Sequence, residues 1–313
     1  MDDPWKTDSK DLLKGAWACN EFFATEAFVD GRFPIKIPKT FARLIDAEDA
    51  LDPLLLQVLP QAPTAATGFV DQPLADASNS PVDGLIRKYN NRVLLIASRA
   101  CAIHCQYCFR QHFEYAQHDA ISNWPAIEAY LLAHSEIDEV ILSGGDPLSL
   151  SDEKLTKLIG DIEAISHIQT LRIHTRTAVA IPSRLTDQLV RLLNNTSLKV
   201  VLVFHINHVR ELSDAFVERL KSLSSPMLLN QSVLLNQIND QVEVLETLSR
   251  ALFKLDILPY YLHMLDKVDG AQNYWVSDDR ALKLHRELQE KLPGYLVPKL
   301  VRDNNNAAKD WLL

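Results

Sequence analysis

The sequence predicts an α/β protein whose parallel sheet curls into a full or partial barrel. Six apolar, β-rich runs recur about every 30 residues from residue 92 onward, and segments with amphipathic helical spacing separate them. Strands and helices that alternate at this spacing are typical of repeated βα units, which form parallel sheets. The chain has 313 residues, of which 47% are hydrophobic, and is therefore long enough to bury a core of this kind.

The chain before residue 87 shows a different pattern. Asp8 to Phe23 and Ala47 to Leu59 have helical spacing, and prolines interrupt this region at Pro34, Pro38, Pro53, Pro60 and Pro63. We therefore expect residues 1–86 to form a mostly helical N-terminal layer. Residues 87–313 are expected to form the barrel core.

The barrel elements follow in order along the chain. The expected strands are Val93–Ala97, Glu139–Ser143, Leu171–His174, Lys199–His205, Met227–Leu235 and Leu258–Met264. The expected helices are Trp124–His134, Asp152–Ile165, Pro182–Asn194, Val209–Leu223, Val242–Leu255 and Asp278–Lys291. Ser151 and Asp240 are candidate capping residues for two of these helices. Chemistry in such barrels collects where the strands end, so residues just after each run are the first candidates for a site.

Composition excludes several classes of function. The formal net charge of −9 argues against a nucleic-acid partner, because a phosphate-binding surface needs a surplus of Lys and Arg. No apolar run reaches the ~18 residues of a membrane span, and the first residues do not have the pattern of a signal peptide. The four cysteines do not form a framework of the secreted disulfide type. We expect a cytoplasmic protein that acts on a small molecule or a protein.

Three cysteines follow the first predicted strand directly, at C-x3-C-x2-C spacing. Cys101, Cys105 and Cys108 would lie in the first βα loop, where three thiolates can hold three irons of a [4Fe–4S] cubane and leave the fourth iron open. S-adenosylmethionine can occupy the open iron and be cleaved to a carbon radical by an electron from the cluster. Two alternatives stay open. One is a zinc site with His104 or His112 as fourth ligand, and the other is a set of buried, inert cysteines.

This cysteine motif, with an aromatic residue before its last cysteine, resembles that of the radical SAM superfamily. Ser143, Gly144, Gly145 and Asp146 end the second predicted strand and are similar to the GGE-type motif, which contacts the methionyl amino group of S-adenosylmethionine. Two glycines allow a close backbone approach, and a carboxylate accepts hydrogen bonds from an ammonium. Gly-Gly-Asp-Pro alone is an ordinary turn, but its position in the βα unit after the cysteines makes it specific.

Further segments resemble the lysine 2,3-aminomutase family. The similarity runs from about residue 35 to the end of the sequence, and it is carried by residues 108–113, 171–176, 206–208, 230–235, 259–266 and 294–300. It implies an isomerase that uses pyridoxal 5′-phosphate as a second cofactor and converts (S)-α-lysine to (R)-β-lysine. An imine lets a neighbouring radical move the amino group to the adjacent carbon, for which no easy polar route exists.

The resemblance also implies partners. Longer family members have extra zinc-binding cysteines in a C-terminal extension, whereas the fourth cysteine here is Cys19. This difference favours the short bacterial branch that supplies β-lysine for elongation factor P. A functional link to elongation factor P and its lysyl ligase is therefore implied, as is an electron donor such as flavodoxin or ferredoxin.

Individual residues carry over from the family. Arg110 matches the arginine that pairs with the substrate carboxylate, a task suited to its planar fork. Asp266 and Asp303 match carboxylates that hold the distant amino group of lysine. Arg92 and Arg176 match basic positions that face the cofactor phosphate. The alternative for Arg110, Asp266 and Asp303 is a solvated surface position.

Lys309 matches the lysine that binds pyridoxal phosphate as a Schiff base, so the barrel core would end in the cofactor-binding segment. The family lysine follows a glycine-rich stretch, whereas residues 303–309 contain no glycine and are shorter by about one residue. Lys299 is the competing lysine, although its place in the apolar run Tyr295–Val301 suggests a strand. Two other hypotheses are a radical SAM enzyme that does not use pyridoxal phosphate and a non-catalytic iron–sulfur or metal-binding module.

Overall fold

A nine-stranded sheet is the centre of the protein in the computed structural model, which describes residues 4–62, 64–74, 77–112, 119–304 and 309–312. Its seven parallel strands lie in chain order across the sheet. They are β4 (Arg92–Ser98), β5 (Glu139–Gly144), β6 (Thr170–Thr175), β7 (Lys199–His205), β8 (Met227–Val233), β9 (Ile257–His263) and β10 (Lys299–Arg302). Each of the six predicted strands is present, with ends that differ from the expected ones by two residues at most.

Each edge of the sheet ends in a short antiparallel strand. β3 (Leu85–Ile86) pairs with β4, and β11 (Asp310–Trp311) pairs with β10. These two edge strands do not pair with each other in the described part of the chain, so the barrel is partial rather than closed. The strands β4 to β7 nevertheless pair in parallel with their residues in register, so their C-terminal ends lie at the same edge of the sheet. The prediction of an α/β partial barrel is confirmed.

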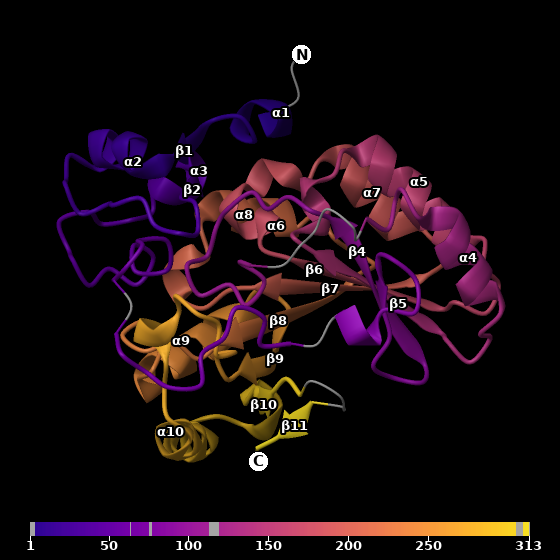
Figure 1. Cartoon of the computed structure of the whole chain (residues 1–313). Coiled ribbons are helices and arrows are strands. Elements are labelled where there is room, and N and C mark those ends of the chain that lie inside the picture. Colours follow the sequence, from indigo (N-terminus) through magenta and orange to yellow (C-terminus); the bar gives the residue numbers. More distant parts are fainter. Residues whose placement is uncertain (1–3, 63, 75–76, 113–118, 305–308, 313) are drawn as a thin grey trace.

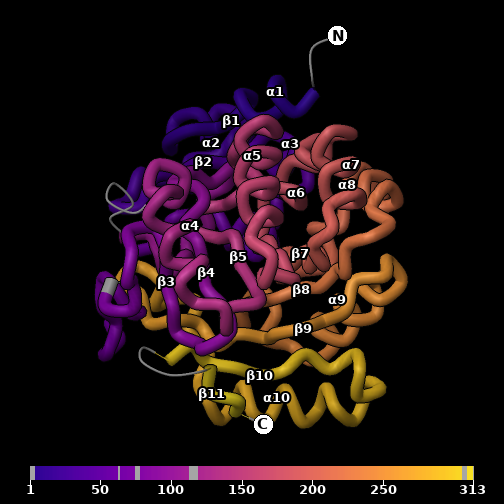
Figure 2. Tube along the Cα trace, turned by 90° about the vertical axis from the view of Figure 1, so that its right-hand side faces the viewer, coloured from indigo at the N-terminus to yellow at the C-terminus, as the bar shows by residue number. Residues whose placement is uncertain are grey.

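Helices cover the outer face of the sheet (Figures 1 and 2). They are α4 (Trp124–Leu132), α5 (Asp152–Glu163), α7 (Asp187–Asn195), α8 (Asp214–Leu220), α9 (Val242–Phe253) and α10 (Asp278–Lys291). Fully buried side chains such as Leu155 and Leu189 pack there against Val140 and Leu171 of the strands. Among the described residues, no helix is both long enough and apolar enough to cross a bilayer.

Capping side chains decide where several helices begin. The Ser151 hydroxyl accepts from the Lys154 backbone amide, as expected. α7 and α8 begin later than predicted, because the hydroxyls of Thr186 and Ser213 cap them after short 3-10 turns. Asp240 was the wrong choice for α9, since its carboxylate accepts from the Gln237 amide in the preceding turn.

The N-terminal layer contains less helix than the prediction. Its elements are α1 (Pro4–Asp8), α2 (Gly15–Phe23), α3 (Lys39–Ala42) and an antiparallel ribbon of β1 (Leu12–Lys14) and β2 (Lys36–Pro38). The expected helix Ala47–Leu59 forms successive turns instead. The buried carboxylate of Asp52 is the reason, because it accepts from the backbone amides of Leu54 and Leu55, just after Pro53, which itself disfavours helix at the residue before it.

This layer packs on the loop that follows β4, at the C-terminal ends of the strands (Figure 1). The Lys36 carbonyl of β2 accepts from the His104 amide at 2.9 Å. Ile37 and Phe41 share a buried cluster with Ile103. The boundary between residues 86 and 87 stays a prediction, and β3 of the main sheet lies just before it. The N-terminal layer therefore holds the cysteine loop against the barrel.

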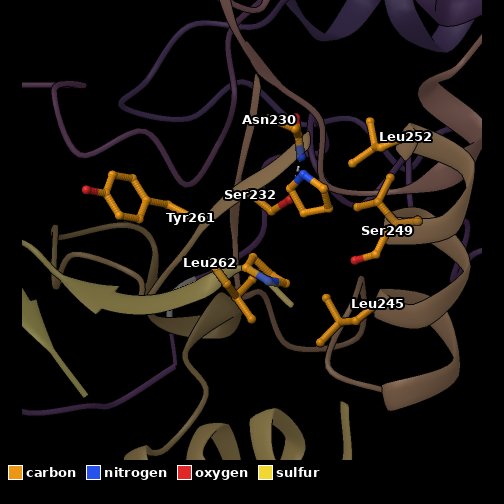
Figure 3. A pocket seen from close by; sticks show the side chains of 10 residues that line it. Asn230, Ser232, Leu245, Ser249, Leu252, Tyr261 and Leu262 are labelled. Atoms are coloured by element: carbon orange, nitrogen blue, oxygen red, sulfur yellow. Dashed lines mark hydrogen bonds between the residues drawn. The ribbon is translucent and has the colours of Figure 1, made fainter. Parts of the chain in front are cut away.

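A cavity of about 10 Å³ lies between α9 and strands β8 and β9, on the helix side of the sheet. Figure 3 shows Leu245, Ser249 and Leu252 of α9 facing it, whereas the Tyr261 ring points away from it. A space of this size holds one water molecule at most. This cavity is therefore too small to hold a cofactor or a lysine molecule.

Candidate active site

The cysteine loop is anchored by the residues between its cysteines. Ala102, Ile103 and Tyr107 are buried, whereas Cys101, Cys105 and Cys108 are each partly exposed. The Cys108 amide donates to the Cys105 carbonyl at 3.0 Å and closes a turn between these two residues. The apolar residues thus fix the loop and leave the three thiols available to a ligand.

The three thiols interact electrostatically with one another. Burial raises the pKa of Cys101 well above the ordinary thiol value, and the charges of Cys108, Asp146 and Cys105 raise it further. Burial, followed by the charge of Cys105, raises the pKa of Cys108 to about 11. These two thiols therefore stay protonated at neutral pH unless a cation is bound, and iron would displace their protons.

Both histidines of the zinc alternative are held by other segments. His104 Nδ1 lies 2.8 Å from the Pro34 carbonyl, and its ring stacks on Phe33. His112 Nε2 lies 3.1 Å from the Asp269 carbonyl. Within the ranges that the structure describes, no three Cys, His, Asp or Glu side chains gather as they would around a single metal ion. Each imidazole thus already has a backbone carbonyl as its partner.

The glycines after β5 allow the chain to approach its own cysteine loop. A Cβ on Gly144, whose φ is +114°, would lie 2.6 Å from the Ser98 carbonyl oxygen. A Cβ on Gly145 would lie 2.5 Å from the Ala100 carbonyl oxygen. The Gly145 amide donates to Ser98, and the amide of the next residue, Asp146, donates to Ala100, both at 2.8 Å. The glycine-rich motif thus braces the backbone that leads to Cys101.

Gly145→Ala should destabilise the protein by about 1–3 kcal/mol, because the added methyl group overlaps backbone that cannot move aside. Urea unfolding measures the effect. Gly160→Ala in α5 is the matched control, since nothing lies within 4 Å of its added Cβ. The control should gain a few tenths of a kcal/mol from higher helix propensity. Equal unfolding midpoints for the two variants would contradict the close-approach argument.

Asp146 joins the end of β5 to the end of β6. One carboxylate oxygen accepts from the Leu148 amide at 2.9 Å, and the other accepts from the amides of Arg176 and Thr177 at 2.7 and 2.8 Å. The Thr175 hydroxyl donates to both oxygens. Burial raises the pKa of Asp146, while these hydrogen bonds oppose the rise. Its contact with a methionyl ammonium stays a prediction. In the structure its oxygens bind the chain's own donors.

Arg176 lies at the end of β6, next to the cysteines. Its Nη1 donates to Cys105 Sγ at 2.9 Å and also to the Tyr107 hydroxyl. Its Nη2 donates to Glu211 Oε2 at 3.1 Å and to Gln57 Oε1 at 2.7 Å. The phosphate contact predicted for Arg176 stays untested. The contacts in the structure connect this side chain to the cysteine loop.

Sequence reasoning missed the polar side chains that surround Arg176. Gln57, Tyr107, Asn207 and Glu211 are all buried and bind one another. They come from the N-terminal layer, the cysteine loop and the segment after β7. The segment Ile-Asn-His at 206–208 was noted as part of the resemblance, but no local pattern marks the other members as partners of an arginine.

Arg92 and Arg110 occupy different parts of the concave face. Arg110 lies in the cysteine loop, and its Nη1 lies 3.5 Å from the Ser143 hydroxyl and 3.4 Å from the Gly144 carbonyl. Arg92 begins β4, at the far end from the cysteines, with its guanidinium 3.6 Å from the centre of the Tyr89 ring. Arg110 is therefore placed beside the glycine motif, and Arg92 is not.

Lys309 points its ammonium at Asp303. The Lys309 Nζ donates to both carboxylate oxygens at 2.8 Å, and the backbone amide of Lys309 donates to the Tyr89 hydroxyl at 3.1 Å. His263 Nδ1 lies 3.5 Å from the same carboxylate. Burial alone would raise the pKa of Asp303, but the hydrogen bond from His263 and the charge of Lys309 bring it well below its usual value.

Asp266 lies between the cysteines and this pair. Burial raises the pKa of Asp266 to about 7, the charge of Asp303 adds to the rise, and Lys309 and Arg110 oppose it. Asp266 in turn acts on the pKa of Cys108. A cavity of about 530 Å³ opens beside Asp266 and Asp303, and its other lining residues include Gly68, Val70, Lys267 and Trp275. The structure thus brings Asp266, Asp303 and Lys309 together at one end of the barrel.

Comparison with known proteins agrees with this geometry. Residues 91–215 match a family model described as a 4Fe-4S single cluster domain. The chain is 42% identical to an L-lysine 2,3-aminomutase of Haemophilus influenzae, covering 95% of this chain and 89% of that protein. It is 44% identical to an L-lysine 2,3-aminomutase of Escherichia coli, covering 90% and 84%. The identity to an L-lysine 2,3-aminomutase of Clostridium subterminale is 33%, covering 84% of this chain and 64% of that protein.

Among solved structures, a radical SAM methyltransferase from Sphaerobacter thermophilus aligns with 70% of this chain and 69% of its own, at a TM-score of 0.48 and 16% identity.

A partial βα barrel with three cysteines in its first βα loop defines the class of radical SAM enzymes. Within this class, the two relatives that are more than 40% identical over nearly the whole chain are both L-lysine 2,3-aminomutases. The chain belongs to the lysine 2,3-aminomutase family.

Proposed function

We propose that this protein is a radical SAM, pyridoxal phosphate-dependent isomerase that converts (S)-α-lysine to (R)-β-lysine. One observation carries the proposal. Cys105 packs against the same buried cluster that contains Leu265. The next residue, Asp266, lines a cavity of about 530 Å³ together with Asp303, and Lys309 Nζ donates to Asp303 at 2.8 Å. A cluster, a lysine-sized substrate and a second cofactor could therefore act on one another within one end of the barrel.

The residues present fit the absent groups. Cys101, Cys105 and Cys108 would hold the cluster, and Lys309 would hold pyridoxal phosphate. Arg176 offers a buried Nε–H that has no hydrogen-bond partner among the described residues, as expected where an acceptor belongs nearby. When bound, the cluster with S-adenosylmethionine would supply a carbon radical, and pyridoxal phosphate would supply the carbonyl that carries the amino group.

The chain's own residues would orient the substrate. The Arg110 guanidinium would pair with the substrate carboxylate beside Gly144. Asp266 and Asp303 would receive the distant ammonium, and the pair between Lys309 and Asp303 supports this role. In that pair a lysine ammonium already sits between both oxygens of the carboxylate, at 2.8 Å from each. Asp303 would become available to the substrate once Lys309 binds the cofactor.

The proposal extends to partners and location. Elongation factor P and its lysyl ligase would consume the β-lysine, and a flavodoxin or ferredoxin would supply electrons in the cytoplasm. Two observations support this extension. The relatives from Escherichia coli and Haemophilus influenzae match this chain over 84% and 89% of their own lengths. The four cysteines are also free thiols, as expected in a reducing compartment.

An anaerobic assay of the full chain tests the proposal. The protein is reconstituted with iron, sulfide and pyridoxal phosphate, then incubated with S-adenosylmethionine, a reductant and (S)-α-lysine. The expected products are (R)-β-lysine and 5′-deoxyadenosine. Norleucine, which matches lysine in chain length but lacks the terminal ammonium, should react at least about 100-fold less well, because Asp266 and Asp303 are left unpaired.

Each other outcome points to a different function. Cleavage of S-adenosylmethionine without β-lysine would reject the aminomutase and keep a radical SAM enzyme of another specificity. Binding of S-adenosylmethionine without cleavage would favour a non-catalytic module. Failure of the chain to bind any cluster would reject the aminomutase and every other radical SAM function.

A further inference from the structure

A buried ion pair lies directly behind one of the predicted cluster ligands. Arg176 is 5% exposed, and its Nη1 donates to Cys105 Sγ at 2.9 Å. Glu211 is fully buried and accepts from Arg176 Nη2 at 3.1 Å. One formal positive charge therefore touches a cysteine sulfur, and one formal negative charge lies on the far side of the same guanidinium.

Both charges are held firmly by neutral groups. Glu211 Oε1 accepts from the backbone amides of Asn207 and His208 at 2.8 and 3.0 Å. Gln57 bridges the pair, because its Oε1 accepts from Arg176 and its Nε2 donates to Glu211. These contacts join the N-terminal layer to the segment after β7. The guanidinium therefore cannot turn away from Cys105 without breaking several buried hydrogen bonds.

One donor of the guanidinium is left over. Arg176 Nε is buried and finds no acceptor within the described ranges of the chain, although a buried unpaired N–H costs about 1–3 kcal/mol. The neighbouring Nη1 already binds a cysteine sulfur. A cluster held by Cys105 would add sulfide acceptors on this side of the guanidinium.

We propose that Arg176 is a positioning residue that raises the reduction potential of the iron–sulfur cluster, with Glu211 as the counter-charge that limits the rise. The proposal rests on the proposed function in one respect, that Cys101, Cys105 and Cys108 hold a [4Fe–4S] cluster. The network thereby acquires a role in electron uptake, in addition to holding the loop in place.

The physical reason is the charge that the cluster gains on reduction. One added electron makes the cluster more negative, so a nearby cation and N–H···S hydrogen bonds stabilise the reduced form more than the oxidised form. Burial strengthens the effect, because water does not screen the charges. A buried carboxylate nearby acts in the opposite direction.

The test is a redox titration of the reconstituted full-length protein, monitored by the electron paramagnetic resonance signal of the reduced cluster. It is carried out without S-adenosylmethionine or lysine. At the potential where the wild-type cluster is half reduced, Arg176→Gln should have a ratio of reduced to oxidised cluster about tenfold lower, which is a shift of about −59 mV for one electron. Glu211→Gln should shift the potential in the positive direction. The double variant should return towards the wild-type value.

Matched controls separate a charge effect from general damage. Arg176→Lys keeps the positive charge and should move the potential less than Arg176→Gln does. The pair of Arg184 with Asp152 is equally buried, and the Arg184 guanidinium donates to Asp152 and to the carbonyls of Leu148 and Leu150. Arg184→Gln should therefore lower stability and leave the potential unchanged.

The assignment would be overturned if Arg176→Gln held a full cluster at the wild-type potential. It would also be overturned if the Arg176 and Glu211 variants shifted the potential in the same direction. Should Arg176→Gln lose its cluster, the Glu211→Gln titration decides, and any result other than a positive shift rejects the proposal. Failure of the wild-type protein to bind a cluster would instead reject the proposed function itself.

Discussion

Cys105→Ser should abolish cluster binding and reduce β-lysine formation by at least about 10⁴-fold, as expected when one member of a catalytic unit is removed. Three thiolates hold three irons of the cubane and leave the fourth iron open, so the loss of one thiolate leaves a second iron without a protein ligand. Cys105 also accepts the hydrogen bond from Arg176. Serine is a poorer ligand than a thiolate for the iron of such a cluster. Iron and sulfide analysis, together with the visible spectrum, measures the loss.

Cys19→Ala is the control for this substitution. Cys19 is fully buried in the N-terminal layer, and burial raises the pKa of its thiol to about 11. Its loss should lower stability by about 1 kcal/mol through lost packing and leave iron content unchanged. The cluster interpretation fails if Cys105→Ser retains wild-type iron and activity.

Lys309→Ala should abolish both the visible absorbance of bound pyridoxal phosphate and the formation of β-lysine, the latter by at least about 10⁴-fold. The amine of Lys309 lies at Asp303 and 5.4 Å from the centre of the Tyr261 ring, on the concave face of the sheet. Cluster content should not change, because Lys309 makes its contacts with Tyr89, Asp303 and Tyr261, which lie outside the cysteine loop. Absorbance spectra before and after dialysis provide the measurement.

Lys299 is the matched control, because it was the competing lysine in the sequence. It begins β10 with an exposed side chain, and its ammonium lies 4.5 Å from the centre of the Trp311 ring. Lys299→Ala should therefore keep the cofactor absorbance and the activity. If Lys299→Ala lost the absorbance and Lys309→Ala kept it, the cofactor lysine would be Lys299 and the assignment of Lys309 would be wrong.

The regular elements of the barrel could be predicted because their signals are local. α10 and β7 have the expected ends, since periodic apolar residues and capping side chains act within a few positions of one another. The region before residue 86 was harder to predict. There the Asp52 side chain competes with helix formation, and this competition depends on burial that no local pattern reveals.

The candidate site divides in the same way. The cysteines, the glycine motif and the family lysine could be found from spacing and resemblance. The partners of these residues could not, and the glycines show why. Gly145 was expected to let a ligand approach, whereas in the structure it lets the Ala100 backbone approach. Asp146 was expected to bind an ammonium, and here it ties β5 to β6.

The sequence by itself determined the alternation of strands and helices, the position of the three cysteines in the loop after the first parallel strand, and the membership of the family. The tertiary structure alone decided that Gln57 meets Arg176 across 119 positions, that Glu211 neutralises this arginine and that Lys309 reaches Asp303. The physical reason is the distance along the chain over which each kind of interaction acts. Helix and strand signals arise from neighbours along the chain, whereas a buried charge takes its partner from whichever segments the packed core places beside it.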